Sequence, residues 1–310
     1  MRPVHHASGI KEPVNRHWIS IREALLWGSR VLRNAQTDNP RLEAATLLAA
    51  LLRCDQAALI AHGDDPLAPE MWTQYQQWVF RRSQGEPLAY ILGYQWFYGL
   101  KLHVTPDVLI PRPETETLVE VALADIRALP SSQPRVVDVG TGSGAIALAI
   151  AAHAPRCWVL GTDISPRALR VAAYNARALR IPIHFAVADL LTPLRGPFDL
   201  IAANLPYVGY EEADILDPAV RLYEPPEALW GGTHGLEIVA RLVEQVPRRL
   251  APKGVLLLEM GYRQGQAMQE LLREAFPNAH VTVYRDLAGH QRVVRVSDSP
   301  PPATPQPTAR

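Results

Sequence analysis

The stretch Asp138-Val139-Gly140-Thr141-Gly142-Ser143-Gly144 decides the fold of this chain of 310 residues. An apolar run at 135–139 leads into the glycines, and an apolar helical pattern begins near Ala145. Glycine permits the tight turn that such a loop needs, and it lets a ligand approach the backbone closely. A strand, a glycine-rich turn and a helix in this order predict a ligand-binding loop at the end of a parallel strand.

Strand and helix patterns alternate along the chain beyond Pro134. Short apolar runs predict strands near 135–139, 158–162, 183–187, 198–203 and 254–259, with helices between them. Two further runs, at 281–284 and 292–296, flank Asp286-Leu287-Ala288-Gly289 and predict a terminal hairpin. The alternation favours a mostly parallel, doubly wound sheet, so the expected fold class is α/β.

A helical segment precedes this α/β region. Ser20-Ile21-Arg22-Glu23 has the pattern of a capping box, Asn39-Pro40 starts a second helix, and Asp55 opens a shorter one. A fourth helix contains apolar and aromatic residues that we expect in the core of a small bundle, namely Trp72, Tyr75, Val79 and Phe80.

These patterns divide the chain into five segments. We expect a disordered lead at 1–16, a helical domain at 17–89, a β-hairpin linker at 90–110, an α/β domain at 111–297 and a disordered, proline-rich tail at 298–310. The loop Ile110-Pro111-Arg112-Pro113-Glu114-Thr115-Glu116 is stiff because it contains two prolines. From composition alone, this loop is a simple linker between domains.

The composition excludes several classes of protein. Acidic and basic residues balance at 31 each, whereas a protein that binds duplex DNA usually has a basic face. Apolar stretches fall short of the ~20 residues that a membrane span needs, and the polar N-terminus lacks the apolar core of a signal peptide. The two cysteines have no metal-ligand spacing. We therefore expect a cytoplasmic monomer without a metal, a membrane contact or direct binding to nucleic acid.

The glycine-rich loop, Gly140-Thr141-Gly142-Ser143-Gly144, predicts a cofactor that contains adenosine. Asp163 comes just past the strand expected at 158–162, where a carboxylate accepts hydrogen bonds from both ribose hydroxyls. The same glycines also satisfy the dinucleotide fingerprint, because Ala145 occupies its last position. The loop alone therefore does not separate S-adenosylmethionine from a nicotinamide dinucleotide.

Two later features favour S-adenosylmethionine. Asp189 follows the third strand, where its carboxylate can accept a hydrogen bond from the adenine amino group, with Leu190 beside the ring. The alternative for Asp189 is a surface residue that caps the next turn. The second feature is Asn204-Leu205-Pro206-Tyr207, which follows the strand at 198–203.

The four residues Asn204-Leu205-Pro206-Tyr207 predict a site for a planar group with an amino nitrogen. Such a nitrogen delocalises its lone pair and is a poor nucleophile, so its orientation matters; oriented approach supplies about 7–11 kcal/mol of a barrier. Asn204 Oδ1 and the Leu205 carbonyl would accept its two hydrogens, Pro206 would stiffen the backbone, and Tyr207 would stack on the planar group. An Asn-capped turn after a strand is the alternative. The motif therefore predicts methyl transfer to an amino group.

Further motifs give the chain a resemblance to a known family. Besides the glycine-rich loop, the proline-rich loop and Asn204–Tyr207, they are Gly85-Glu86-Pro87-Leu88-Ala89-Tyr90-Ile91-Leu92-Gly93, Tyr223-Glu224-Pro225 with Ala228-Leu229, Leu258-Glu259-Met260-Gly261 and Asp286-Leu287-Ala288-Gly289. From about residue 20 to 296, the chain resembles the HemK/PrmC family, the peptide chain release factor N5-glutamine methyltransferases.

The resemblance implies an S-adenosylmethionine-dependent methyltransferase domain with a Rossmann-like, mostly parallel sheet of seven strands. A β-hairpin would join it to a small N-terminal helical domain that docks the protein substrate. The implied reaction methylates the glutamine of the Gly-Gly-Gln loop in bacterial release factors and leaves S-adenosylhomocysteine.

The resemblance also implies roles for particular residues. Gly140–Gly144, Asp163 and Leu190 would bind the cofactor, and Asn204–Tyr207 would hold the glutamine. Asn204 would also touch the methionine end of the cofactor. The loop at 110–116, with Arg112 and Glu114, would shape the glutamine pocket instead of serving only as a linker.

One residue departs from the family pattern, which is Asn-Pro-Pro-Tyr. Leu205 stands at the first proline position. The implied role of that position belongs to its backbone carbonyl, which any residue supplies, and the loss is the fixed φ of proline. We therefore expect near-normal activity.

Other functions compete with this interpretation. Adenine-N6 methyltransferases of nucleic acid use the same four-residue logic, but they must extract a base and generally have basic recognition segments. A glutamine methyltransferase that acts on a ribosomal protein is the nearer alternative. A binding module that has lost its chemistry and a nicotinamide oxidoreductase are the remaining ones.

Overall fold

The computed structural model describes residues 18–302. The disordered lead that we expected at 1–16 and the part of the tail from 303 onward lie outside the described residues. The chain divides into two compact units, one ending at Ile91 and the other beginning at Leu92. Each unit is described by itself.

The first unit is helical. Its helices are α1 (Ile21–Asn34), α2 (Pro40–Leu52), α3 (Gln56–Ala61) and α4 (Pro69–Ser83), and α5 (Leu88–Leu92) lies at the boundary between the units. The capping box at the start of α1 is present, since Ser20 and Glu23 bond each other's backbone and side chain. Asp55 caps α3 by accepting from the Ala58 N–H, whereas the Asn39 side chain makes no capping bond to α2.

The core of this unit contains part of the aromatic set that we expected there. Tyr75 and Val79 of α4 are fully buried, and the Tyr75 hydroxyl donates to the Ala44 carbonyl oxygen at 3.1 Å. Phe80 was expected in the core, but 63% of its surface is exposed. It follows Val79 directly, so it points to a different side of the helix.

The second unit begins with a β-hairpin of two strands, β1 (Tyr94–Phe97) and β2 (Leu100–His103). Tyr98 and Gly99 form the turn, and both have positive φ. The Tyr98 N–H donates to Glu116 Oε1 at 2.7 Å, which ties the hairpin to the helix α6 (Glu116–Ala128).

A seven-stranded sheet forms the middle of the second unit, in the order β10-β11-β9-β6-β3-β4-β5. The strands are β3 (Arg135–Val139), β4 (Trp158–Asp163), β5 (His184–Val187), β6 (Phe198–Ala203), β9 (Leu250–Glu259), β10 (His280–Arg285) and β11 (Gln291–Ser297). β3 pairs in parallel with β4 and β6, whereas β11 is antiparallel to both β9 and β10. The expected mostly parallel α/β sheet is confirmed, with antiparallel pairing only at β11.

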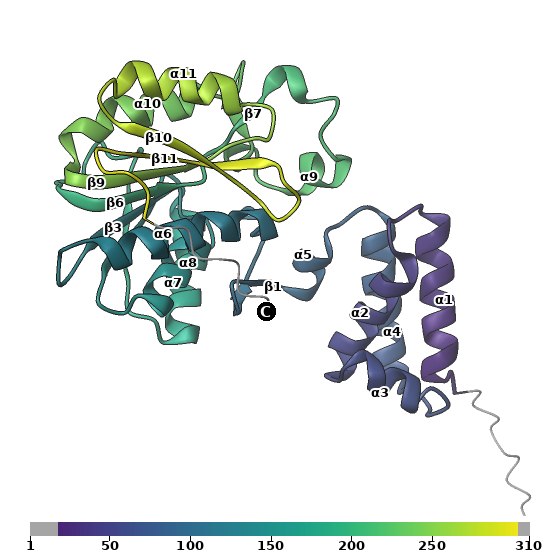
Figure 1. Ribbon diagram of the computed structural model, residues 1–310. Helices are drawn as coiled ribbons and strands as arrows, with labels where there is room; N and C mark the ends of the chain where they lie inside the picture. Colours follow the sequence, from purple (N-terminus) through teal and green to yellow (C-terminus); the bar gives the residue numbers. More distant parts are fainter. Residues whose placement is uncertain (1–17, 303–310) are drawn as a thin grey trace, which may run out of the picture. The chain divides into compact units, whose positions relative to one another are not determined.

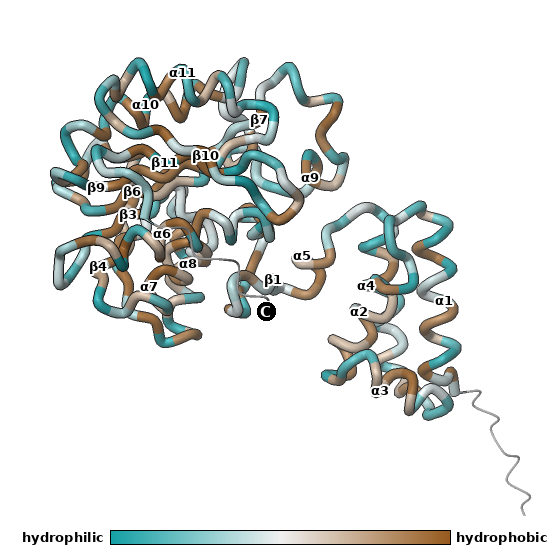
Figure 2. Tube along the Cα trace, viewed as in Figure 1, coloured by the Kyte–Doolittle hydropathy of each residue, from teal (hydrophilic) through white to brown (hydrophobic). Residues whose placement is uncertain are grey.

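Helices cover both faces of this sheet (Figure 1). α6, α7 (Ala145–His153) and α8 (Pro166–Leu179) pack on one face, and α10 (Glu237–Gln245) and α11 (Gly265–Ala275) pack on the other. Successive strand residues alternate between the two cores: Val136 joins the first and Val137 the second. The apolar colour in Figure 2 accordingly gathers in the strands and the inner sides of these helices.

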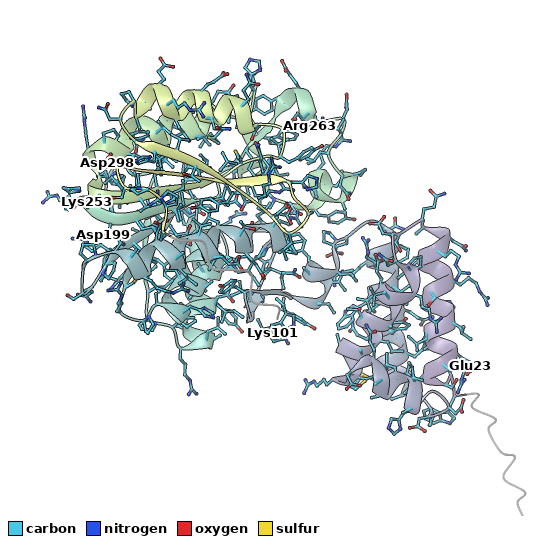
Figure 3. The ribbon with its side chains drawn as sticks, viewed as in Figure 1. Glu23, Lys101, Asp199, Lys253, Arg263 and Asp298 are labelled. Atoms are coloured by element: carbon cyan, nitrogen blue, oxygen red, sulfur yellow. The ribbon has the colours of Figure 1, made fainter. Side chains whose placement is uncertain are left out.

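The carboxyl ends of β3, β4 and β6 meet at one edge of the sheet because these strands are parallel. The segment after β6 contains elements that the sequence patterns did not predict: β7 (Val208–Gly209), α9 (Pro218–Tyr223) and β8 (Trp230–Gly232). Side chains such as those of Asp199 and Lys253 lie at the outside of this unit (Figure 3). Within residues 18–302, no helix combines the length and the apolar character needed to cross a membrane.

Candidate active site

The glycine-rich loop connects β3 to α7 in a conformation that favours glycine. Gly140, Gly142 and Gly144 have φ values of +73°, +55° and +84°. A Cβ on Gly140 would lie 3.0 Å from Leu205 Cδ2, so the loop packs directly against the segment after β6. A Cβ on Gly142 would meet no atom within 4 Å, which leaves open space beside that backbone.

The side chain of Asp138 fixes the glycine-rich loop through hydrogen bonds. Its side chain is fully buried, and its Oδ2 accepts from Thr141 Oγ1 at 2.6 Å and from the Ala147 N–H at 3.1 Å. The pKa of Asp138 is raised to about 7: burial is the main cause and the charge of Asp163 adds to it, whereas the hydrogen bonds from Thr141 and Ala147 act in the opposite direction. This supporting role of Asp138 was not predicted from its place in the motif.

Asp163 is the last residue of β4, and its side chain also fixes the glycine-rich loop. Its Oδ2 accepts from the Gly142 N–H at 2.9 Å, and its Oδ1 accepts from the Ser165 N–H at 2.9 Å. Burial raises its pKa, against these backbone bonds. Each oxygen keeps a lone pair for a further donor.

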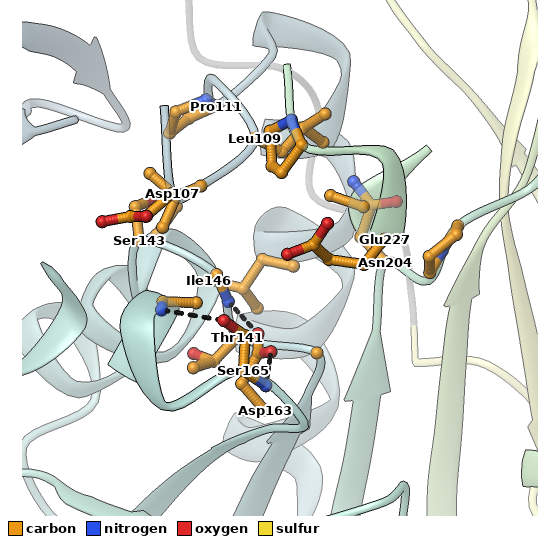
Figure 4. A pocket seen from close by; sticks show the side chains of 18 of the residues that line it. Asp107, Leu109, Pro111, Thr141, Ser143, Ile146, Asp163, Ser165, Asn204 and Glu227 are labelled. Atoms are coloured by element: carbon orange, nitrogen blue, oxygen red, sulfur yellow. Dashed lines mark hydrogen bonds between the residues drawn. The ribbon is translucent and has the colours of Figure 1, made fainter. Parts of the chain in front are cut away.

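A cavity lies beside the loop and Asp163. Its lining comes from the segments 107–115, 140–146, 163–168, 204–206 and 225–228. Figure 4 shows Thr141, Asp163, Asn204 and Glu227 around this hollow. The structure therefore brings together the glycine loop, Asp163, Arg112 and Asn204, which the sequence analysis had placed on separate segments.

The structure does not bring Asp189 and Leu190 into this lining. Asp189 is exposed, and its Oδ2 lies 2.6 Å from Arg241 Nη2 on α10. Leu190 is buried with a φ of +55°. The surface alternative for Asp189 therefore describes its position in this structure, and the expected contact with adenine stays a prediction.

Asn204 follows β6 and faces the helix α6. Its Nδ2 donates to Thr115 Oγ1 at 3.2 Å. Leu205 is buried, while Pro206 lines the cavity with Asn204. The Tyr207 carbonyl accepts from Gln264 Nε2 at 2.7 Å, and burial raises the pKa of its phenol, followed by the charge of Glu259.

The proline-rich loop forms one wall of the cavity. Arg112 pairs with the buried Glu224, which also accepts from the Ile110 N–H at 3.2 Å. Burial raises the pKa of Glu224, and Arg112 lowers it. Glu114 does not line the cavity; its Oε1 lies 3.9 Å from Arg292 Nη2. Of the two substrate residues expected on this loop, only Arg112 is therefore at the cavity wall.

Three residues beside the site had no predicted role, namely Glu224, Glu259 and Arg292, and Thr115 had only the general role of its loop. The signal for two of them was available, because Glu224 and Glu259 lie in the quoted motifs Tyr223-Glu224-Pro225 and Leu258-Glu259-Met260-Gly261. A charged residue inside an apolar motif indicates a buried partner or a function.

The charges of the cavity suit a cationic cofactor. The charged side chains in its lining are the acids Asp107, Asp163 and Glu227 and one base, Arg112, which the buried Glu224 already pairs. S-adenosylmethionine carries a sulfonium, an ammonium group and ribose hydroxyls, and carboxylates accept from the latter two. The donor set therefore fits S-adenosylmethionine.

The sheet order, the glycine loop and the acidic cavity define a methyltransferase domain of the Rossmann-like class. The family model "Methyltransferase small domain" matches residues 120–221, and the model "PrmC N-terminal domain" matches residues 23–93. A protein from Koribacter versatilis named release factor glutamine methyltransferase is 40% identical over 278 residues, 89% of this chain and 98% of that protein. One of the same name from Xylella fastidiosa is 44% identical over 255 residues, 82% of this chain and 91% of that protein. The chain belongs to the release factor glutamine methyltransferase family, which confirms the resemblance in its motifs.

Solved structures agree at the level of the fold. The catalytic domain of hMettl16, in complex with the MAT2A 3'UTR hairpin 6, superposes on 76% of this chain and 84% of its own with a TM-score of 0.52. The identity is 17%, so this likeness shows the fold alone.

Proposed function

We propose that this chain transfers a methyl group from S-adenosylmethionine to the side-chain amide nitrogen of a glutamine in bacterial release factors. The products are N5-methylglutamine and S-adenosylhomocysteine, and the substrate glutamine is that of the Gly-Gly-Gln loop. The observation that carries the proposal is the placement of Asn204 in the same cavity as the glycine loop and Asp163. Family membership supports the identity of the acceptor.

The proposed cofactor site consists of Gly140, Thr141, Gly142, Ser143 and Asp163, which line the cavity, and of Gly144, which caps the start of α7. The Asp163 oxygens that bind Gly142 and Ser165 are available to ribose hydroxyls through their second lone pairs. Asp189 and Leu190 remain proposed for the adenine end, where the Asp189–Arg241 pair must open before Asp189 can bind an amino group. When bound, S-adenosylmethionine supplies an electrophilic methyl group.

The proposed acceptor site consists of Asn204, Leu205, Pro206 and Tyr207, with Arg112 and Glu114 from the proline-rich loop. Asn204 Oδ1 and the Leu205 carbonyl accept the two amide hydrogens of the glutamine, which aims its nitrogen and opposes delocalisation of its lone pair. Tyr207 packs against the planar amide. The surplus proton leaves to water after transfer, so no dedicated base is required.

We also propose where and in what form the protein acts. Its substrate is a translation factor, so the reaction takes place in the cytoplasm. The chain acts as a monomer on the release factor, without direct contact to nucleic acid.

Substitutions of Leu205 test whether methyl transfer depends on the backbone carbonyl at this position and not on the side chain. Replacing Leu205 by proline should change the turnover by less than about tenfold, because the carbonyl that accepts from the glutamine is retained and only φ is restricted. The measurement is kcat for methyl transfer to the release factor, with Leu205→Ala as the matched control that trims the side chain against Gly140. A gain well above tenfold in Leu205→Pro alone would mean that leucine has damaged the site.

The acceptor class is tested by competition. Labelled S-adenosylmethionine is offered together with a purified release factor, duplex DNA, RNA and ribosomal protein. The proposal expects label on the release factor alone. Label on a nucleic acid would establish an adenine-type reaction, and label on the ribosomal protein would establish the nearer alternative.

A further inference from the structure

Glu259 is a buried acid beside the proposed acceptor site. It is the last residue of β9, and only 1% of its surface is exposed. Neither carboxylate oxygen has a hydrogen-bond partner of ordinary geometry among the described residues. A buried polar group without a partner is rare in proteins and calls for a reason.

The sheet register places Glu259 next to Asn204. β6 and β9 are parallel, and Ala203 of β6 lies opposite Leu258 of β9. Asn204 and Glu259 are the next residues along each strand, so their side chains emerge on the same face, toward Thr115 at the start of α6. Thr115 and Asn204 lie near enough to Glu259 that their side chains lower its pKa.

The three side chains have complementary hydrogen-bonding capacity. An ionised carboxylate only accepts, and a threonine hydroxyl has a single hydrogen to donate. When Thr115 gives that hydrogen to Glu259, its oxygen can only accept, and the Nδ2 of Asn204 is the group that donates to it at 3.2 Å. The side-chain amide of Asn204 then cannot flip to exchange its oxygen and nitrogen, and its Oδ1 is directed away from Thr115.

We propose that Glu259 is a positioning residue for methyl transfer: its carboxylate fixes the Thr115 hydroxyl, which in turn holds Asn204 with Oδ1 toward the acceptor amide. This inference rests on the proposed function, because it explains why Asn204 would offer an acceptor and not a donor to the glutamine. It assigns a task to the otherwise unpartnered Glu259 oxygens and to Thr115.

The arrangement depends on the charge of Glu259. Its pKa is raised to about 7: burial is the main cause and the charge of Glu114 adds to it, whereas Thr115, Arg292 and Asn204 act in the opposite direction. Tyr207 is the other titratable group beside it, and Asp286 holds Arg292 at 2.9 Å. Below this pKa the acid donates to Thr115, whose hydrogen is then free for Asn204 Oδ1, and the amide can turn over. The transfer rate should therefore rise with pH through about 7.

The ionisation of Glu259 should affect the stability of the protein in the opposite direction to the transfer rate. Because the pKa of Glu259 is raised in the folded protein, the stability that it contributes is present at low pH and is lost as the pH rises through about 7. Replacing Glu259 by glutamine should therefore raise the thermal midpoint at about pH 8 while it slows the reaction. A residue with a purely structural role would lower the midpoint instead.

The experiment measures the single-turnover rate of methyl transfer to a purified release factor from about pH 5.5 to about pH 8.5. Glu259→Gln and Thr115→Val should each lower the rate at high pH by roughly tenfold and abolish its rise near pH 7. Affinity of Glu259→Gln for S-adenosylmethionine should stay within about twofold, since Glu259 does not line the cavity. Thr115 does line it, so the rates of Thr115→Val are measured at saturating S-adenosylmethionine. Thr115→Ser keeps the hydroxyl and should keep the pH dependence, and Glu270→Gln, an exposed acid on α11, is the matched control.

Two results would overturn the inference. One is a Glu259→Gln rate that still rises through pH 7, which would assign the ionisation to another acid such as Asp138. The other is a Thr115→Val enzyme with the rate and pH profile of the wild type; this variant decides the matter even if Glu259→Gln does not fold. A wild-type protein that transfers no methyl group to the release factor would instead contradict the proposed function.

Discussion

Replacing Asn204 by alanine should lower methyl transfer to the release factor by about a thousandfold, the scale seen when one preorganised hydrogen-bonding group is removed from an active site. The side chain supplies one of only two proposed acceptors for the glutamine hydrogens, and it is held by Thr115 at the cavity wall. Without this acceptor, the amide nitrogen of the glutamine keeps its delocalised lone pair and is no longer oriented toward the methyl group. The fold should survive, because Asn204 is only partly buried.

The measurement compares single-turnover rate, cofactor affinity and thermal midpoint. Asn278→Ala, an exposed asparagine before β10, is the matched control and should behave like the wild type. If Asn204→Ala binds S-adenosylmethionine and still transfers at a near-native rate, the role assigned to Asn204 is wrong.

Replacing Asp163 by asparagine should weaken S-adenosylmethionine binding by about a hundredfold, since hydrogen bonds to a charged group contribute about 1.5–3 kcal/mol each. Both carboxylate oxygens accept from backbone N–H groups, of Gly142 and Ser165. An asparagine has one acceptor and one donor end, so one of these N–H groups would face the amide NH₂. The variant loses a negative charge at the proposed cofactor site, and it weakens the hydrogen bonding that fixes the glycine-rich loop.

Equilibrium binding of S-adenosylmethionine checks this prediction directly. Asp199→Asn is the matched control, because Asp199 lies at the opposite end of β6 from Asn204 and accepts from the Arg135 N–H (Figure 3). Its affinity should match the wild type. An Asp163→Asn protein with unchanged affinity would remove Asp163 from the proposed cofactor site.

The sheet could be predicted from sequence because its signals are local. Each central strand is a short apolar run, and the glycine loop follows one of them directly, so strands such as Phe198–Ala203 were predicted with the bounds that the structure has. Parallel pairing then brings the ends of β4 and β6 to one edge, which explains why Asp163 and Asn204 share a cavity.

The remainder depends on partners that are distant in the chain. Asp189 pairs with Arg241, and Glu224 pairs with Arg112, and neither pairing leaves a periodic signal in the sequence. The segment between Tyr207 and α10 has only short elements, so no hydrophobic periodicity in the sequence predicts β7, α9 or β8. Phe80 was misplaced because apolar character alone does not decide which side of a helix is buried.

The Glu259–Thr115–Asn204 arrangement illustrates the same limit. All three residues lie in separate sequence motifs, and only the pairing of β6 with β9 makes Asn204 and Glu259 neighbours. Their hydrogen-bonding capacities acquire meaning once they are adjacent. The proposed role of Asn204 followed from residue type, and its proposed orientation follows from the fold.

The central claim is methyl transfer to one glutamine of a release factor. The most direct test incubates this protein with labelled S-adenosylmethionine and either a native release factor or its Gly-Gly-Gln→Gly-Gly-Ala variant, followed by peptide mass mapping. We expect label on that glutamine of the native factor and none on the variant. Equal label on both factors, or label on neither, would contradict the claim.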